Sequence, residues 1–260
     1  MRWIRFEHNN QIAYGIVEGE TVQPVSGSPF DSYEKSGGQI ALSDVNLLVP
    51  VVPPTFYAAG LNYVEHIKSV ASSEGRETRI PEKPDVGYRA ANSLIPHEAP
   101  IIIPKDAGER VQYEAELVAV IGKKAKHLSE AEALSCVLGY TIGNDVSERD
   151  WQALDRTLWR AKNTDTFAPM GPWIETDVDL DSMRTTVRVN GETPIEFATN
   201  DMLFGIARYI STISQYVTLH PGDVIWMGTE GASPNLKAGD VCEIEISGIG
   251  TLRNTFQAEV

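Results

Sequence analysis

The chain has little cysteine, no long apolar run and no excess of positive charge. Its 260 residues include two cysteines, Cys136 and Cys242, too few for a disulfide framework. No stretch approaches the roughly 18 apolar residues of a membrane-spanning helix. The 22 basic and 36 acidic side chains leave a net charge of −14, which repels phosphate backbones and anionic lipids. We therefore expect neither nucleic acid nor a membrane as a partner, and the two thiols in apolar surroundings indicate a cytoplasmic protein.

Several catalytic signatures are also missing from the chain. It contains no Gly-x-Ser-x-Gly elbow, no Walker loop, no dinucleotide-binding Gly-x-Gly-x-x-Gly and no His-Glu-x-x-His. These absences argue against serine hydrolases, nucleotide triphosphatases, NAD enzymes and zinc proteases. The composition, 42% hydrophobic and 22% charged, is that of an ordinary globular protein.

The pattern of strands and turns predicts two domains. Residues 1–52 form a small β-rich domain in this interpretation, with short strands at Trp3–Phe6 and Ile12–Val17. Prolines then stiffen the segment 49–54 into an extended connector, because proline fixes its own φ angle and restricts the preceding residue. We place the boundary there, so that residues 53–260 make up the catalytic domain.

The middle of the chain alternates strands with short helices. Val111–Gly122 and Tyr140–Asp145 are expected strands, and a helix is expected from about Glu148 to Leu158 with Ser147 as its N-cap. Ala71–Pro84 is polar and aperiodic, which is typical of a loop. The sequence therefore predicts a mixed, β-rich α/β fold.

Two carboxylates stand out within the first of these strands. Glu114 and Glu116 share one face, because side chains on a strand alternate, and that face continues with apolar Val118. Buried carboxylates need compensation, and a divalent cation provides it. A solvated strand end is the alternative. Asp145, which ends the second strand, offers a third oxygen ligand, although it also fits a turn or a helix cap. Together the three favour Mg²⁺ or Mn²⁺ over zinc.

Five separate motifs resemble the fumarylacetoacetate hydrolase superfamily: GLNYVEH (60–66), YEAELVAVIG (113–122), GNDVSERDWQ (143–152), RAKNTDTFAPMGP (160–172) and GTLRN (250–254). The resemblance covers most of the chain. It implies a mixed β-sandwich roll behind a small N-terminal β-rich domain, and a homodimer. It also implies a Mg²⁺ or Mn²⁺ site made by Glu114, Glu116 and Asp145, and a small anionic substrate with a 2-oxo acid or 2-hydroxy-dienoate head.

The same resemblance implies roles for five further residues. His66 and Lys162 match catalytic positions of the family, and Arg89, Gln152 and Thr229 match positions that contact substrate. Read without the family, Lys162 and Gln152 are ordinary surface residues and His66 is a solvated histidine. Arginine at position 89 suits a second substrate carboxylate, because its guanidinium binds carboxylates through two hydrogen bonds.

Two positions depart from the family pattern. Many members carry a glutamate three residues after the catalytic histidine, where this chain has Ser69. Either Glu65 or the distant Glu243 substitutes for it, or water activation is weak. Many members also continue Gly-Thr with proline, where this chain has the acidic Glu230.

We expect a metal-dependent enzyme acting on an acylpyruvate-like or 2-hydroxy-dienoate acid. Hydrolysis of a C–C bond is the favoured reaction, by way of an enolate that the cation stabilises. An isomerase, a tautomerase or a decarboxylase of 2-oxo or 2-hydroxymuconate-type acids is the alternative, because these reactions pass through the same enolate. Serine at position 69 weakens the hydrolase and decarboxylase readings. An alternative of another class is a protein that binds 2-oxo acids without catalysis.

Overall fold

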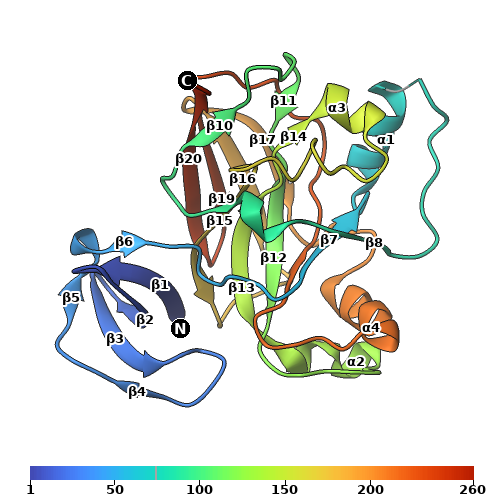
Figure 1. The fold of residues 1–260 in the computed structure, drawn as a ribbon. Coiled ribbons are helices and arrows are strands. Elements are labelled where there is room, and N and C mark those ends of the chain that lie inside the picture. Colours follow the sequence, from blue (N-terminus) through green and yellow to red (C-terminus); the bar gives the residue numbers. More distant parts are fainter. Residues whose placement is uncertain (74) are drawn as a thin grey trace.

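The computed structural model describes residues 1–73 and 75–260, and β-strands dominate it (Figure 1). The largest sheet contains 13 strands in the path β4-β3-β2-β1-β15-β13-β12-β18-β7-β8, with β5, β6 and β9 attached beside it. Its strands are β1 (Arg2–His8), β2 (Gln11–Glu18), β3 (Thr21–Gly27), β4 (Tyr33–Lys35), β5 (Ile40–Ala41), β6 (Asn46–Leu47), β7 (Phe56–Gly60), β8 (Asp85–Tyr88), β9 (Leu94–Ile95), β12 (Ala115–Ile121), β13 (Val137–Asn144), β15 (Ala168–Glu175) and β18 (Val224–Trp226).

Two smaller sheets and four α-helices complete the fold. A five-stranded sheet, in the order β10-β20-β19-β16-β17, contains β10 (Ile101–Ile103), β16 (Arg184–Val189), β17 (Glu192–Ala198), β19 (Val241–Ile246) and β20 (Gly250–Ala258). A two-stranded sheet pairs β11 (Val111–Gln112) with β14 (Ser147–Glu148). The α-helices are α1 (Val64–Ser73), α2 (Glu130–Ala133), α3 (Arg149–Leu154) and α4 (Ile206–Tyr216), and 3₁₀ turns lie at Leu42–Asp44, Ala91–Ser93 and Leu134–Cys136. None of these helices in the described residues has the length and apolar character to cross a membrane.

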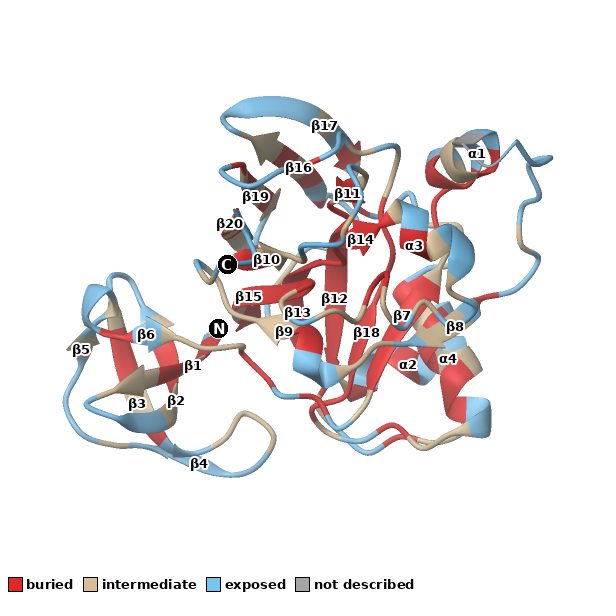
Figure 2. Cartoon of the chain, turned by 45° about the horizontal axis from the view of Figure 1, so that its top comes forward, coloured by how far each residue is buried: buried red, intermediate tan, exposed pale blue. Residues whose placement is uncertain are grey.

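The core lies on both faces of the large sheet. One cluster joins Leu117 and Ile225 of the large sheet to Val187 and Ile244 of the five-stranded sheet, so the two sheets bury their facing side chains against each other. A second cluster, around Trp226, covers the opposite face. The buried strands therefore lie in the middle of the body, as Figure 2 shows. At about 25 cal/mol per Å² of apolar surface, this burial is the main source of stability.

The N-terminal strands form a small unit beside the main body (Figure 1). It has its own cluster, which includes Ile4, Phe6 and Val22. Its strand β1 pairs with β15, which joins the unit to the large sheet. The segment between β6 and β7 has no regular secondary structure. The small β-rich unit is therefore present, and the expected boundary between residues 52 and 53 stays a prediction.

The expected strand and helix limits need three corrections. The strand expected over 111–122 is divided into β11 and β12, because β11 pairs with β14 instead of β13. Helix α3 begins at Arg149 with Glu148 as N-cap, since the Glu148 carboxylate accepts the amide hydrogen of Trp151, and the helix ends at Leu154. Helix α1 extends to Ser73, three residues into the expected loop. Residue 74 of that loop lies outside the described residues, and 75–84 has no regular secondary structure.

Candidate metal centre and active site

The pairing of β12 with β13 brings three carboxylates together. Glu116 lies opposite Gly143, and the amide of Asp145 donates a hydrogen bond to the carbonyl of Glu114 at 3.0 Å. Oxygen atoms of Glu114, Glu116 and Asp145 all lie within 4.8 Å of one another, and all three residues are buried. The shared face expected of Glu114 and Glu116 is thus present, and their neighbour Val118 packs in the cluster around Trp226.

Close packing of a glycine against an aromatic ring holds β13, the strand that ends at Asn144 directly before Asp145. A Cβ atom on Gly143 would lie 2.5 Å from the ring of the fully buried Trp226. Any larger residue at position 143 would push β13 away from the ring and shift Asp145 with it. The glycine therefore sets how closely β13 approaches this face of the site.

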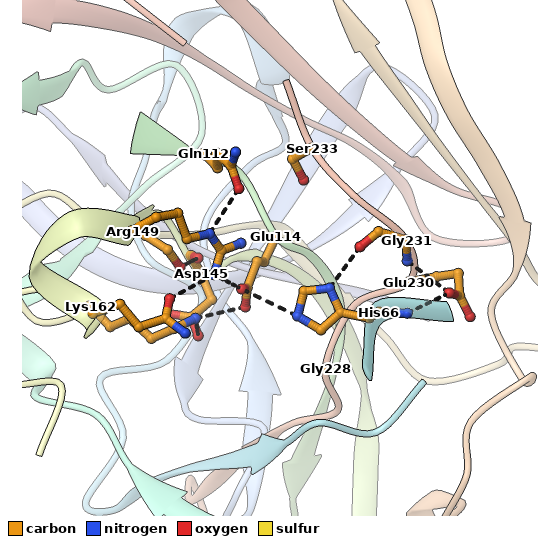
Figure 3. Close-up of polar contacts among 12 residues, drawn as sticks. His66, Gln112, Glu114, Asp145, Arg149, Lys162, Gly228, Glu230, Gly231 and Ser233 are labelled. Carbon is orange, nitrogen blue, oxygen red and sulfur yellow. Dashed lines mark hydrogen bonds and ion pairs between the residues drawn. The ribbon is translucent and has the colours of Figure 1, made fainter. Parts of the chain in front are cut away.

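Cationic side chains hold two of the three carboxylates (Figure 3). The Nζ atom of Lys162 lies 2.7 Å from Oε2 of Glu114 and 2.8 Å from Oδ2 of Asp145. Arg149 contributes a second contact to Glu114 at 2.7 Å, and Arg89 grips Asp145 through Nε and Nη2. These cations are themselves nearly buried, so the ion pairs are poorly screened by water.

Neighbouring charges shift the pKa values of Glu114 and Glu116 in opposite directions. Burial alone would raise the pKa of Glu114, but the charges of Lys162 and Arg149 outweigh it and hold the pKa well below its usual range. Burial and the neighbouring carboxylates Asp145 and Glu114 raise the pKa of Glu116 well above its usual range. Among the described residues, the hydrogen bond to the Glu116 carboxylate comes from the amide of Gly228, at 2.7 Å.

This arrangement fits a hard divalent cation. Glu116 is 1% exposed and has one backbone hydrogen bond in place of a cationic partner. A buried carboxylate in that condition is costly, and a divalent cation at the meeting point of three carboxylates supplies the missing charge. The donor set is all oxygen, which suits Mg²⁺ or Mn²⁺. Glu114, Glu116 and Asp145 are the residues that would hold it.

His66 lies on the first turn of α1 and faces the same carboxylates. Its Nε2 atom lies 3.8 Å from Oε1 of Glu114, and its Nδ1 atom lies 2.7 Å from the carbonyl oxygen of Gly231. Neither of the carboxylates expected to assist it does so. Glu65 is exposed and binds Lys68, and Glu243 lies on β19, 3.7 Å from Arg253. The partner of the imidazole is a backbone carbonyl, because the loop after β18 passes directly beside α1.

A cavity of about 240 Å³ opens beside His66. Its walls combine cationic and polar side chains with a few apolar ones: Ser69, Val70, Arg110, Gln112, Arg149, Gln152, Ala153, Ala232 and Ser233. Gln152 accepts a hydrogen bond from Arg149 at 2.7 Å within this wall. Thr229 is buried beside Gly228. The structure therefore brings His66, Lys162, Arg89 and Gln152 to one site, where their expected roles stay predictions.

Sequence reasoning missed one member of the site, Arg149, and the contact made by another, Glu230. Arg149, which binds both Glu114 and Gln152, lies three residues before Gln152, a spacing that puts both on one helix face. That spacing is the signal that identifies it. Glu230 accepts hydrogen bonds from the amides of His66 and Gly231, at 3.1 and 2.8 Å. No local pattern predicts this contact, because 164 residues separate the two partners.

Comparison with known proteins gives two family matches. The description "Fumarylacetoacetate (FAA) hydrolase C-terminal" matches residues 55–257, and "Rv2993c-like, N-terminal" matches residues 1–50. These matches confirm both the expected superfamily and the expected β-rich fold with a small N-terminal β domain.

Three of the similar proteins are named as isomerases or tautomerases, while others are named as hydrolases or as an isomerase/decarboxylase. A crystal structure of 5-carboxymethyl-2-hydroxymuconate delta-isomerase from Mycobacterium smegmatis is 35% identical, with a TM-score of 0.90 and full coverage of both chains. A 2-hydroxyhepta-2,4-diene-1,7-dioate isomerase from Mycobacterium marinum is 34% identical, with a TM-score of 0.89, over 100% of this chain and 99% of that one. A mitochondrial oxaloacetate tautomerase of Homo sapiens is 36% identical over 82% of this chain and 69% of its own length.

Because the pKa of Glu114 is lowered and the pKa of Glu116 is raised, replacing each glutamate should change the stability of the cation-free protein in opposite directions. Glu116→Gln should abolish cation binding, yet it should stabilise the cation-free protein at neutral pH, because a raised pKa marks a carboxylate whose ionised form opposes folding. Glu114→Gln should destabilise the cation-free protein by on the order of 3 kcal/mol, since it removes the carboxylate partner of the buried Arg149 and one of the two carboxylate partners of the buried Lys162. Both effects are measured by thermal unfolding in EDTA.

The matching measurement is thermal unfolding with saturating Mn²⁺, together with metal content by plasma emission. Wild type should hold one ion per chain and gain about 2.7 kcal/mol at a hundredfold excess over Kd. Neither Glu114→Gln nor Glu116→Gln should be stabilised by Mn²⁺ in this way. Glu65→Gln, an exposed glutamate on α1, is the control and should behave as wild type. Full metal content in Glu116→Gln would contradict the assignment of this site.

Proposed function

The chain belongs to the fumarylacetoacetate hydrolase family, and on that premise we propose that it is a Mg²⁺- or Mn²⁺-dependent tautomerase or isomerase of a 2-oxo dicarboxylic acid. The observation that supports this reaction is the setting of His66. Its Nε2 atom faces the metal-site carboxylates, and its Nδ1 atom contacts a backbone carbonyl. A single imidazole beside the enolate position can take a proton from one atom of the substrate and return it to another, which is the transfer that a keto–enol or double-bond shift requires.

Other side chains of the site have separate roles in the proposed reaction. A bound divalent cation acts as a Lewis acid that stabilises the negative charge developing on the 2-oxo oxygen. Lys162 and Arg149 add fixed positive charge beside the carboxylates in a largely buried site, where such charges are effective without rearranging. Gln152 orients the Arg149 guanidinium. We propose that Arg89 positions Asp145 and also makes the expected contact with substrate. We propose that Thr229 binds the substrate carboxylate, as expected.

Cavity chemistry supports a substrate with a second carboxylate. The cavity beside His66 contains two guanidinium groups, those of Arg110 and Arg149. Arg149 is balanced by Glu114, and Arg110 is 43% exposed and contacts the half-exposed Asp150 at 3.2 Å. A carboxylate at the far end of the substrate would meet Arg110 in a bidentate contact. The three relatives described above are named for acids with at least two carboxylates.

Hydrolysis of a C–C bond stays a prediction and is our second candidate. The observation in its favour is the cavity itself, which at about 240 Å³ has room for a water molecule beside His66. Against it stands the setting of Nδ1, which has no carboxylate to strengthen the base. The homodimer and the cytoplasmic location are likewise part of this proposal.

The central test is turnover of oxaloacetate. We predict that the wild-type protein with Mg²⁺ accelerates the enol–keto interconversion, followed by the fading ultraviolet absorbance of the enol, and that EDTA stops it. His66→Gln should lower kcat at least a hundredfold, the contribution typical of a positioned general acid–base group. His8→Gln, whose imidazole lies in the N-terminal unit against Asp44, is the matched control and should be unchanged. Undiminished kcat in His66→Gln would exclude the histidine as proton carrier.

A second prediction separates the tautomerase from the hydrolase. Ser69 lies one helical turn after His66 and lines the same cavity. A carboxylate there would stabilise the protonated imidazole and make it a stronger base towards water. Ser69→Glu should therefore raise the rate of acylpyruvate cleavage about tenfold, equivalent to about 1.4 kcal/mol of barrier. Product pyruvate is the readout, and Ser69→Gln controls for size. If wild type already cleaves acylpyruvate faster than it tautomerises oxaloacetate, the second candidate replaces the first.

A further inference from the structure

A single loop connects the metal site to the proton carrier. The segment 227–233 follows β18, and its amide at Gly228 binds the carboxylate of Glu116. Asn62, just before α1, donates a hydrogen bond to the carbonyl of Met227 at 2.9 Å. At the other end, the hydroxyl of Ser233 donates to the carbonyl of Tyr113 at 2.7 Å. Both ends of the loop are therefore anchored to elements that carry site residues.

Glu230 anchors the middle of the same loop. Its Oε1 atom accepts two hydrogen bonds, from the amide of Gly231 at 2.8 Å and from the amide of His66 at 3.1 Å (Figure 3). The second donor belongs to the first turn of α1, where amide groups have no partner within the helix and a negative charge is favourable. One carboxylate thus clamps the loop to the residue whose side chain faces the site.

Geometry in this clamp determines which imidazole nitrogen carries the proton. The carbonyl oxygen of Gly231 can only accept, so the 2.7 Å contact places a hydrogen on Nδ1 of a neutral His66. Nε2 then has a free lone pair, and it is Nε2 that faces Glu114 at 3.8 Å. A larger residue at position 231 would disturb this contact, because Gly231 has a φ angle of +70° and a Cβ atom there would lie 2.6 Å from the side chain of Ile195.

From these contacts we infer that Glu230 is a positioning residue: it holds the carbonyl of Gly231 against Nδ1 of His66, so that Nε2 is the basic nitrogen on the metal side. The role of His66 as proton carrier rests on the proposed function, whereas the tautomer does not. The Glu230 carboxylate holds the amide of Gly231, and the carbonyl of Gly231 contacts the imidazole. This carbonyl takes the place of a carboxylate that would contact the ring directly.

The test is the tautomer of His66 by nitrogen-15 NMR. Protein labelled at its five histidines is compared in wild type, Glu230→Ala, Glu230→Gln and Glu65→Ala, and His66→Gln identifies the signal. Spectra are recorded in EDTA at a pH high enough for neutral imidazole. Wild type should carry its proton on Nδ1. Glu230→Ala should shift the population towards Nε2–H, while Glu230→Gln should restore Nδ1–H, because an amide oxygen also accepts both hydrogen bonds. Glu65→Ala should match wild type.

Kinetics and metal binding complete the experiment. Glu230→Ala should lower kcat for oxaloacetate about tenfold with KM and Mg²⁺ affinity unchanged, since the carboxylates are intact. An unchanged Nδ1–H tautomer in Glu230→Ala would overturn the inference, whatever the turnover. Loss of Mg²⁺ binding in that variant would also overturn it, because Glu230 would then support the whole loop. Absence of wild-type turnover on oxaloacetate and acylpyruvate, with the tautomer shift still present, would instead reject the proposed function alone.

Discussion

The ammonium group of Lys162 lies between two buried carboxylates, 2.7 Å from Glu114 and 2.8 Å from Asp145, and the site depends on this bridge. Glu114 precedes β12 and Asp145 follows β13, so the lysine joins the ends of two neighbouring strands to the segment after α3. Arg89 binds Asp145 and Arg149 binds Glu114, so all three cations contact these two carboxylates. The remaining cost falls on Glu116, which has no cationic partner among the described residues and is the group that most needs a divalent ion.

In the proposed mechanism, proton transfer and cation binding depend on one loop. The loop after β18 binds Glu116 through the Gly228 amide and His66 through the Gly231 carbonyl. Displacement of the loop would therefore disturb the metal ligand and the base together. Under the proposed function, this coupling explains how a serine at position 69 is compatible with proton transfer by His66: orientation comes from the backbone, and a single proton shuttle needs orientation more than it needs added basicity.

Much of the metal site could be predicted from the sequence, because strand periodicity is local. Alternation placed Glu114 and Glu116 on one face, and the strand ending at Asp145 brought the third oxygen beside them. Contacts between distant segments had no such signal. Glu230 meets His66 across 164 residues, and the start of α3 depends on which of two neighbouring side chains, Ser147 or Glu148, accepts the first free amide. Loop paths decide such contacts, and periodicity does not describe loop paths.

The most direct measurement of the central claim is a crystal structure of the protein with Mn²⁺ and oxalate, using the anomalous scattering of manganese. Our account predicts one anomalous peak per chain, coordinated by Glu114, Glu116 and Asp145, with oxalate completing the ligand shell on the side of His66. Lys162 should still contact Glu114 and Asp145 through the oxygens that do not bind the ion. A peak bound elsewhere, or a peak at this site that lacks Glu116 as a ligand, would contradict it.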